Sequence, residues 1–121
     1  MCYVLHYTYH RTGGGLMPGP RALLRRVDPG VLARAAEIIK LLGHRERLMI
    51  LEALERGELS VTEICELCDL PQAICSQHLR RLRQLKVVSC RKEGLNVYYR
   101  VIEPKVHHIL ECIRTCDVRP R

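Results

Sequence analysis

VTEICELCDLPQAICSQHLRRL, residues 61–82, is the stretch that decides the fold of this chain. A break at Leu70-Pro71 separates two helical segments, because proline and the residue before it both resist a helical conformation. The longer segment is predicted to run from Gln72 to about Lys86, and its inner side carries apolar residues at helical spacing, Ile74, Cys75, Leu79, Leu82 and Leu85. Two helices joined by a turn this short indicate a helix-turn-helix.

The residues before this stretch extend the helical pattern. Apolar residues recur at three- and four-residue spacing over 31–42, and a second run over 44–56 stops at Gly57. Ser60 or Thr62 can cap the helix that follows, which has an acidic residue in its first turn, where a negative charge favours the helix dipole. Two further helices are therefore expected ahead of the helix-turn-helix.

Beyond the long helix the apolar period changes from helical to alternating. Residues 87–91 and 96–101 predict two strands around the turn 92–94, and Pro104 opens a last helix, where proline is well tolerated. The apolar stripe of that helix comprises Val106, Ile109, Leu110 and Ile113. The predicted fold is mainly α with a small β-hairpin, a winged helix-turn-helix of element order ααααββα.

Length and composition favour a single folded unit with a loose start. The chain has 121 residues, enough for one modest core, and no Trp or Phe to build it from. Residues 1–30 are rich in Gly and Pro without a helical or strand period and are expected to be a flexible leader, whose natural start could be Met1 or Met17. We expect the winged helix-turn-helix domain over 31–117 and a tail over 118–121.

The charge distribution points to nucleic acid. The formal net charge is +7 and the pI about 9.3, which favours a polyanionic partner, DNA before a membrane. Seven acids against three arginines occupy 44–69, whereas 77–93 is strongly basic, so positive charge gathers on the long helix and the hairpin. The sequence has no export signal and no apolar run near the roughly 18 residues of a membrane span. A cytoplasmic protein with reduced thiols is expected.

The helix-turn-helix and the hairpin together resemble the ArsR/SmtB (arsenic-repressor) family. The resemblance lies in LPQAICSQHL (70–79), in RKEG (91–94) and in VYY (97–99). It implies a dimeric repressor that releases its operator when an inducer binds, with the first and last helices between subunits and the long helix in the major groove. Leu95 departs from the basic residue common at the wing tip, and Pro71 from a small polar helix cap.

This frame assigns candidate contacts to an inverted-repeat operator in double-stranded DNA. Base edges are expected to meet the start of the long helix, at Gln72, Ala73, Ser76 and Gln77. Phosphates are expected to meet Arg80, Arg81, Arg91 and Lys92, and His78 belongs to the same candidate set. The alternative is a winged-helix protein–protein interaction module without specific DNA binding. Nothing in the sequence activates a nucleophile, so we do not expect an enzyme.

Three of the seven cysteines lie in the opening stretch and are interpreted mainly as core residues. Cys65, Cys68 and Cys75 stand where the fold needs small or apolar side chains, and a thiol serves as a small hydrophobe. GELSVTEIC (57–65) resembles the family's metalloid box GELCVCDLC, but Ser60 and Thr62 replace its first two cysteines. Arsenic(III) prefers soft sulfur ligands, and the hydroxyls of Ser60 and Thr62 do not supply them, so that box is broken.

The last helix carries the pair of cysteines that is the stronger candidate for sensing. Cys112 and Cys116 are spaced i, i+4 and share one face, suited to a soft metal or metalloid ion or to a thiol-reactive species, although packing remains the simpler interpretation. The candidate sensing thiols are therefore Cys112, Cys116, Cys65 and Cys68, and no metal ligand or resident cofactor is assigned. The family's zinc site on this helix is not expected, because Lys105 stands where a histidine would.

Overall fold

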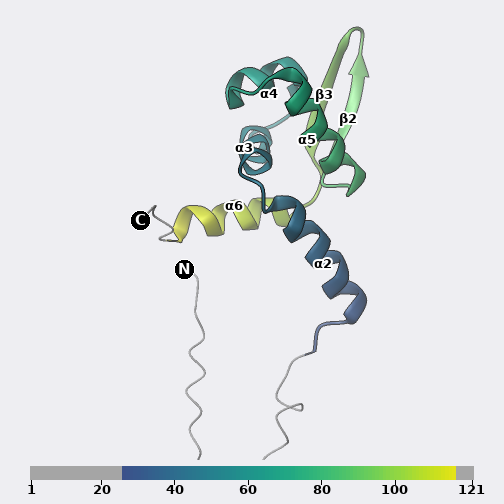
Figure 1. The fold of residues 1–121 in the computed structure, drawn as a ribbon, viewed down its shortest axis with the longest axis vertical. Helices are drawn as coiled ribbons and strands as arrows, with labels where there is room; N and C mark the ends of the chain where they lie inside the picture. Colours follow the sequence, from purple (N-terminus) through teal and green to yellow (C-terminus); the bar gives the residue numbers. More distant parts are fainter. Residues whose placement is uncertain (1–25, 117–121) are drawn as a thin grey trace, which may run out of the picture.

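The computed structural model describes residues 26–116, which fold into five helices and a three-stranded antiparallel sheet (Figure 1). In chain order the elements are α2 (Pro29–Leu42), α3 (Arg45–Leu54), β1 (Leu59–Ser60), α4 (Val61–Cys68), α5 (Gln72–Gln84), β2 (Val88–Glu93), β3 (Asn96–Val101) and α6 (Lys105–Thr115). The predicted winged helix-turn-helix is confirmed: α4 and α5 form the helix-turn-helix, and β2 and β3 form the wing. Most of the predicted leader and the tail 118–121 lie outside the described residues.

Strand β1 is the element that the sequence did not predict. Leu59 and Ser60 pair with Tyr99 and Tyr98, which places β1 at the edge of the sheet in the order β1-β3-β2. Two residues are too short to show an alternating pattern. Their extended conformation depends on the neighbouring strand β3, which lies almost forty residues further along the chain.

Helix α3 occupies the centre of the domain and packs against α2, α4, α5, β3 and α6. Its Ile50 and Leu51 are fully buried, as are Leu79 and Leu82 of α5 and Val87 ahead of β2. The core consists of Leu, Ile, Val and Cys, as expected for a chain without Phe or Trp. Each buried aliphatic side chain contributes about 1.5–3 kcal/mol, so the position of every neighbouring element depends on α3.

One predicted core residue is on the surface. Ile74 was expected on the inner side of α5, but it is 37% exposed. Cys75, Leu79 and Leu82 follow at i, i+4 and i+7 and are fully buried, and they define the inner face of α5. Ile74 precedes Cys75 by one residue, a rotation of about 100° on a helix, and this turns its side chain away from that face.

The start of α4 is fixed by a capping box. The Ser60 hydroxyl accepts a hydrogen bond from the Glu63 backbone N–H at 3.2 Å, and the Ser60 backbone N–H donates to the Glu63 carboxylate at 3.1 Å. Of the two predicted caps, Ser60 is therefore the one used. Asp69 ends the helix in the left-handed conformation, with φ of 52°, and turns the chain toward α5.

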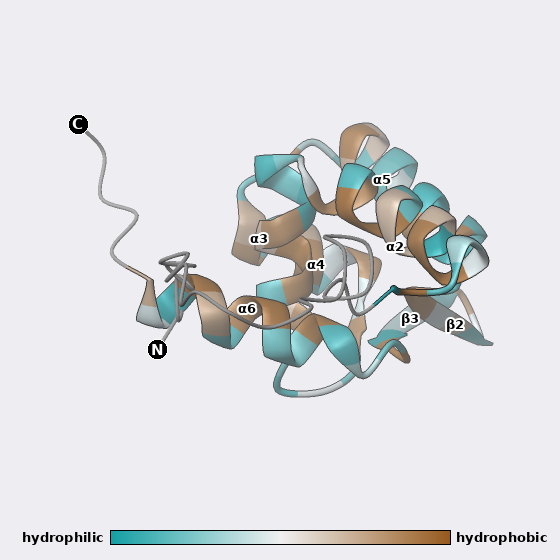
Figure 2. Cartoon of the chain, turned by 90° about the horizontal axis from the view of Figure 1, so that it is seen from below, coloured by the Kyte–Doolittle hydropathy of each residue, from teal (hydrophilic) through white to brown (hydrophobic). Residues whose placement is uncertain are grey.

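Helices α2 and α6 leave the base of the domain in different directions (Figures 1 and 2). Only the last turn of α2 is buried, at Leu41 and Leu42, whereas its apolar residues Val31, Leu32 and Ile39 are more than half exposed. Arg34 of α2 donates a hydrogen bond to the carbonyl of Leu85, where α5 ends. Within residues 26–116, no helix combines the length and the apolar character needed to cross a membrane.

A cluster of charges joins α6 to α3. Both Glu55 carboxylate oxygens accept hydrogen bonds from Arg114, and one also lies 2.8 Å from His107 Nδ1. These bonds, from Arg114 first and His107 second, lower the pKa of Glu55 from 4.5 to about 2. The carboxylate at the end of α3 is therefore ionised throughout the neutral range and holds the first turn and the end of α6.

The capping box predicts a specific loss of stability. Ser60→Ala removes the hydroxyl that accepts from the first turn of α4, and the free energy of unfolding should fall by about 1 kcal/mol in denaturant titration. Thr62→Ala is the matched control, because Thr62 is exposed and is not the N-cap, and its effect should stay within about 0.5 kcal/mol. Equal effects of the two substitutions would contradict this assignment.

The Glu55 cluster predicts a dependence of stability on acid. Because the folded-state pKa of Glu55 lies below its ordinary value, the carboxylate stabilises the fold at neutral pH, and this contribution is lost as the pH falls from about 5 to about 2. Glu55→Gln should therefore lose less stability than the wild type over that range, measured by denaturant unfolding at each pH. Glu66→Gln, at an exposed acid of α4, should keep the wild-type pH dependence. Parallel curves for Glu55→Gln and wild type would refute the role of the cluster.

Candidate DNA-binding surface

The outer side of α5 presents the polar residues expected to meet base edges. Gln72, Ala73 and Gln77 are exposed and Ser76 is half-buried, all in the first two turns of the helix. Helix α5 starts directly after Pro71, and no side chain caps it. Because the buried residues Cys75, Leu79 and Leu82 fix the opposite side of α5 in the core, the polar side is directed outward as a rigid unit.

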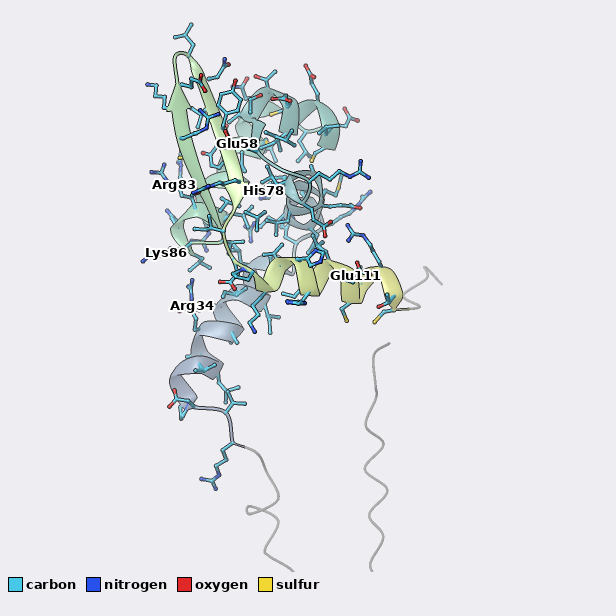
Figure 3. The ribbon with its side chains drawn as sticks, turned by 180° about the vertical axis from the view of Figure 1, so that it is seen from behind. Arg34, Glu58, His78, Arg83, Lys86 and Glu111 are labelled. Carbon is cyan, nitrogen blue, oxygen red and sulfur yellow. The ribbon has the colours of Figure 1, made fainter. Side chains whose placement is uncertain are left out.

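Basic side chains continue this surface toward the wing. Arg80 and Arg81 are exposed as expected, and so are Arg83 and Lys86, which the set of expected contacts left out. Figure 3 shows Arg83 and Lys86 on the side of the domain where the wing lies. Burial raises the pKa of Tyr99 on β3, and the positive charges of Arg83 and Arg80 act against this rise. Both arginines therefore lie near the wing. The helical repeat could have identified Arg83, since it lies three residues beyond Arg80.

On the wing, contacts with three side chains fix the position of the Arg91 guanidinium. The Arg91 guanidinium lies over the ring of Tyr98, 4.6 Å from its centroid, and forms ion pairs with Glu58 and Glu93. Hydrogen bonds that Arg91 donates to Glu93 and Glu58 raise the pKa of Arg91, so its charge is permanent, yet the two carboxylates already partly balance it. Lys92 is exposed beside it, and Leu95 at the tip is 100% exposed.

His78 lies apart from this surface. Its side chain is buried, with the whole residue 8% exposed, and its ring is directed at α3 rather than at solvent. Nε2 is 2.6 Å from a Glu46 carboxylate oxygen, and Nδ1 accepts a hydrogen bond from Arg47 Nε at 3.2 Å. The sequence placed His78 among the DNA contacts because its neighbours belong there. Its position on α5 instead turns it inward, so we leave it out of the proposed contact set.

His44, Glu46 and His78 are close enough for one ligand atom from each to lie within 4.8 Å of the others. Such a set could hold a zinc-like ion, since two histidines and a carboxylate are common zinc ligands. A metal-bound histidine, however, normally donates its second ring N–H to an acceptor. The second nitrogen of His78 accepts from Arg47 instead, so in this arrangement the donor set does not fit a metal ion.

The thiols fall into two environments. Cys68 and Cys75 are buried, and burial is the main cause that raises both of their pKa values, that of Cys75 to about 12. A thiol that stays protonated is a poor nucleophile and a poor metal ligand. Cys65 packs partly against the same core. These positions agree with the interpretation as core residues.

On α6, the Sγ atoms of Cys112 and Cys116 lie 3.7 Å apart. Cys112 is exposed and Cys116 half-buried, at the end of the helix. The i, i+4 spacing thus brings the two thiols together at the end of α6.

Comparison with known proteins agrees with this geometry. A family model described as a helix-turn-helix domain matches residues 42–91. Transcriptional repressor PagR of Bacillus anthracis is 38% identical over 79 residues, which covers 64% of this chain and 79% of the relative. Its crystal structure aligns with a TM-score of 0.64 at 36% identity, covering 71% of this chain and 99% of that one.

Two further solved structures have the same fold. HlyU from Vibrio cholerae aligns with a TM-score of 0.69 at 32% identity, over 76% of this chain and 100% of that one. The homodimeric winged helix-turn-helix DNA-binding domain Mb0332 from Mycobacterium bovis, a possible ArsR-family regulator, aligns with a TM-score of 0.64 at 26% identity, over 76% and 87% of the two chains.

Together, the winged helix-turn-helix, the polar and basic surface of α5 and the relatives define a DNA-binding transcriptional repressor, not an enzyme. The chain belongs to the ArsR/SmtB family of transcriptional regulators.

Proposed function

We propose that this repressor binds an inverted-repeat operator as a homodimer, with α5 of each subunit in a major groove and the wing against the flanking backbone. The observation that carries the proposal is that α5 exposes polar residues at its start and basic side chains along the rest of its length. Helix-turn-helix dimers place their two recognition helices about one turn of DNA apart, which gives the operator its symmetry.

The contacts divide by chemistry. Gln72, Ala73, Ser76 and Gln77 read base edges, and Arg80, Arg81, Arg91 and Lys92 meet phosphates, joined by Arg83 and Lys86. Arg91 has to exchange its carboxylate partners for a phosphate when it docks. Leu95 adds no charge at the wing tip, so Arg91 and Lys92, just behind the tip, supply the charge with which the wing holds the backbone.

The exposed apolar side chains of α2 and α6 support the dimer. Val31, Leu32 and Ile39 of α2 and Ile113 of α6 are between 44% and 65% exposed. Apolar patches on two helices that project from the base of a small domain are typical of a protein–protein interface. As a regulator of transcription, the dimer acts in the cytoplasm, where its thiols stay reduced.

For the inducer, we propose a thiophilic species that acts on Cys112 and Cys116, either a soft metal or metalloid ion or a thiol-reactive molecule. These thiols lie 3.7 Å apart on a helix that also carries an exposed apolar residue of the proposed dimer interface. A change there can alter how two subunits sit and thereby the spacing of the two α5 helices. A preference of ~3 kcal/mol for the wrong spacing lowers DNA affinity more than a hundredfold by linkage.

Operator binding tests the proposed function. With an operator selected from random DNA, Gln77→Ala should lose discrimination worth about 1–3 kcal/mol, because it removes a base contact. Arg80→Ala should weaken binding to all sequences alike and reduce the salt slope by about one. Fluorescence anisotropy at several salt concentrations measures both. If no sequence were selected, or if both variants bound like wild type, the interaction-module alternative would replace this proposal.

Operator release tests the inducer site. Protein with both Cys112→Ser and Cys116→Ser should stay on the operator in the presence of cadmium, arsenite, peroxide or a persulfide donor, whereas Cys65→Ala should be released like wild type. The physical reason is access, since Cys112 is exposed and Cys65 packs against the core. A full response without the α6 thiols, together with no response in Cys65→Ala, would move the sensor to the degenerate box.

A further inference from the structure

The buried ring of His78 links the recognition helix to two residues of α3. Its Nε2 is 2.6 Å from the Glu46 carboxylate, and its Nδ1 lies 3.2 Å from Arg47 Nε. The ring of His44 packs against it, with centroids 4.6 Å apart. Figure 3 shows His78 directed into the domain, away from the wing side where Arg83 projects. Every polar atom of the ring therefore has a partner inside the protein.

The hydrogen bonds fix the protonation pattern of the ring. An arginine can only donate, so Nδ1 of His78 accepts and carries no proton. In the neutral ring Nε2 then holds the proton and donates it to Glu46. The result is a directed chain in which Arg47 donates to His78 and His78 donates to Glu46. Such a chain is satisfied only while α5 keeps one rotation relative to α3.

The same arginine reaches a third helix. Arg47 Nη1 donates to the carbonyl of Leu41 at 3.1 Å, in the last turn of α2. Arg47 thus binds the end of α2 with one nitrogen and the middle of α5, through His78, with another. A shift of α2 relative to α3 moves the Leu41 carbonyl and so changes the position of the Arg47 guanidinium. The hydrogen bond from Arg47 to His78 changes with it, and this alters how α5 is held.

We infer that Glu46, Arg47 and His78 are positioning residues that set the rotation of α5 about its axis and thereby its choice of DNA sequence. The inference rests on the proposed function, because it concerns how the proposed base contacts are aimed. We call these three residues the α5 clamp. None of them touches DNA, and the clamp acts through the neighbouring residue Gln77.

Geometry explains why apolar packing alone does not suffice. A rotation of α5 by about 20° moves an atom at a helix radius of about 5 Å by nearly 2 Å, which is enough to break a hydrogen bond to a base edge. Aliphatic contacts between Leu79 or Leu82 and the core are not directional and tolerate small rotations. Hydrogen bonds weaken steeply when their angle changes, so a buried, fully paired network selects one orientation.

The experiment separates orientation from stability. In the full-length protein, His78→Leu puts an apolar side chain in the buried position and removes both hydrogen bonds. His78→Gln instead keeps an N–H near the position of Nε2, from which it can donate to Glu46. Affinities for the selected operator and for a scrambled duplex are measured beside unfolding free energies. We expect His78→Leu to lower operator affinity about tenfold with the scrambled duplex unchanged, and His78→Gln to restore most of that loss.

A second position keeps the test decisive if His78→Leu does not fold. The Glu46 side chain is 36% exposed, so Glu46→Leu leaves the core intact while removing the acceptor, and it should lower the same affinity ratio. Arg45→Gln is the matched control, because Arg45 lies next to Glu46 on an exposed position. A ratio equal to wild type in His78→Leu or Glu46→Leu would overturn the clamp. So would a loss confined to stability, in which both DNA affinities fall together.

Three other results have separate meanings. Wild-type protein that binds operator and scrambled DNA equally would refute the proposed function itself, and the clamp with it. Operator-specific wild type with equally specific clamp variants would refute the clamp alone. Addition of Zn²⁺ should leave the affinity ratio unchanged, and a zinc effect abolished by His44→Ala would replace the clamp by a metal site at these three side chains.

Discussion

The burial of one face of α5 against α3 and the sheet is the constraint on which the rest of the structure depends. Cys75, Leu79 and Leu82 have no exposed surface, and this fixes which side of α5 meets solvent. The polar residues at its start and the arginines beyond follow from that choice. The same burial explains the behaviour of Cys75 on this face. Its thiol packs as a small hydrophobe, and burial raises its pKa, so it keeps its proton.

Polar contacts at the edges of the core connect the helices that apolar packing only brings near. Glu55 holds α6 through Arg114 and His107, Arg34 reaches the end of α5, and Arg47 joins α2 to α5 through His78. Each of the helices that carry the proposed dimer interface is thus bonded to α3 or α5. Under the proposed function, these contacts couple the arrangement of the subunits to the position of α5.

Departures from the family pattern fall on two parts of the chain, the DNA-binding elements, at Leu95 and Pro71, and the metalloid box. The metalloid box has lost two sulfur positions to Ser60 and Thr62, and Ser60 serves instead as the cap of α4. This hydroxyl accepts the Glu63 backbone N–H and so stabilises the start of the helix-turn-helix. The two thiols that lie together at the end of α6 belong to a different helix from that box.

The sequence by itself determined the helix-turn-helix, the wing and the last helix. Apolar periodicity and the Leu70-Pro71 break are local signals, and they can be recognised without knowing which distant residues pack nearby. It also determined the basic character of α5 and the wing. Only the tertiary structure decided that His78 turns inward, that Ile74 is exposed, that Leu59 and Ser60 form a strand and that Arg91 is already ion-paired. Three of these depend on partners far away in the sequence, Glu46 for His78, Tyr99 for Leu59 and Glu58 for Arg91, and local patterns carry no information about distant partners. The exposure of Ile74 depends instead on which face of α5 the core takes.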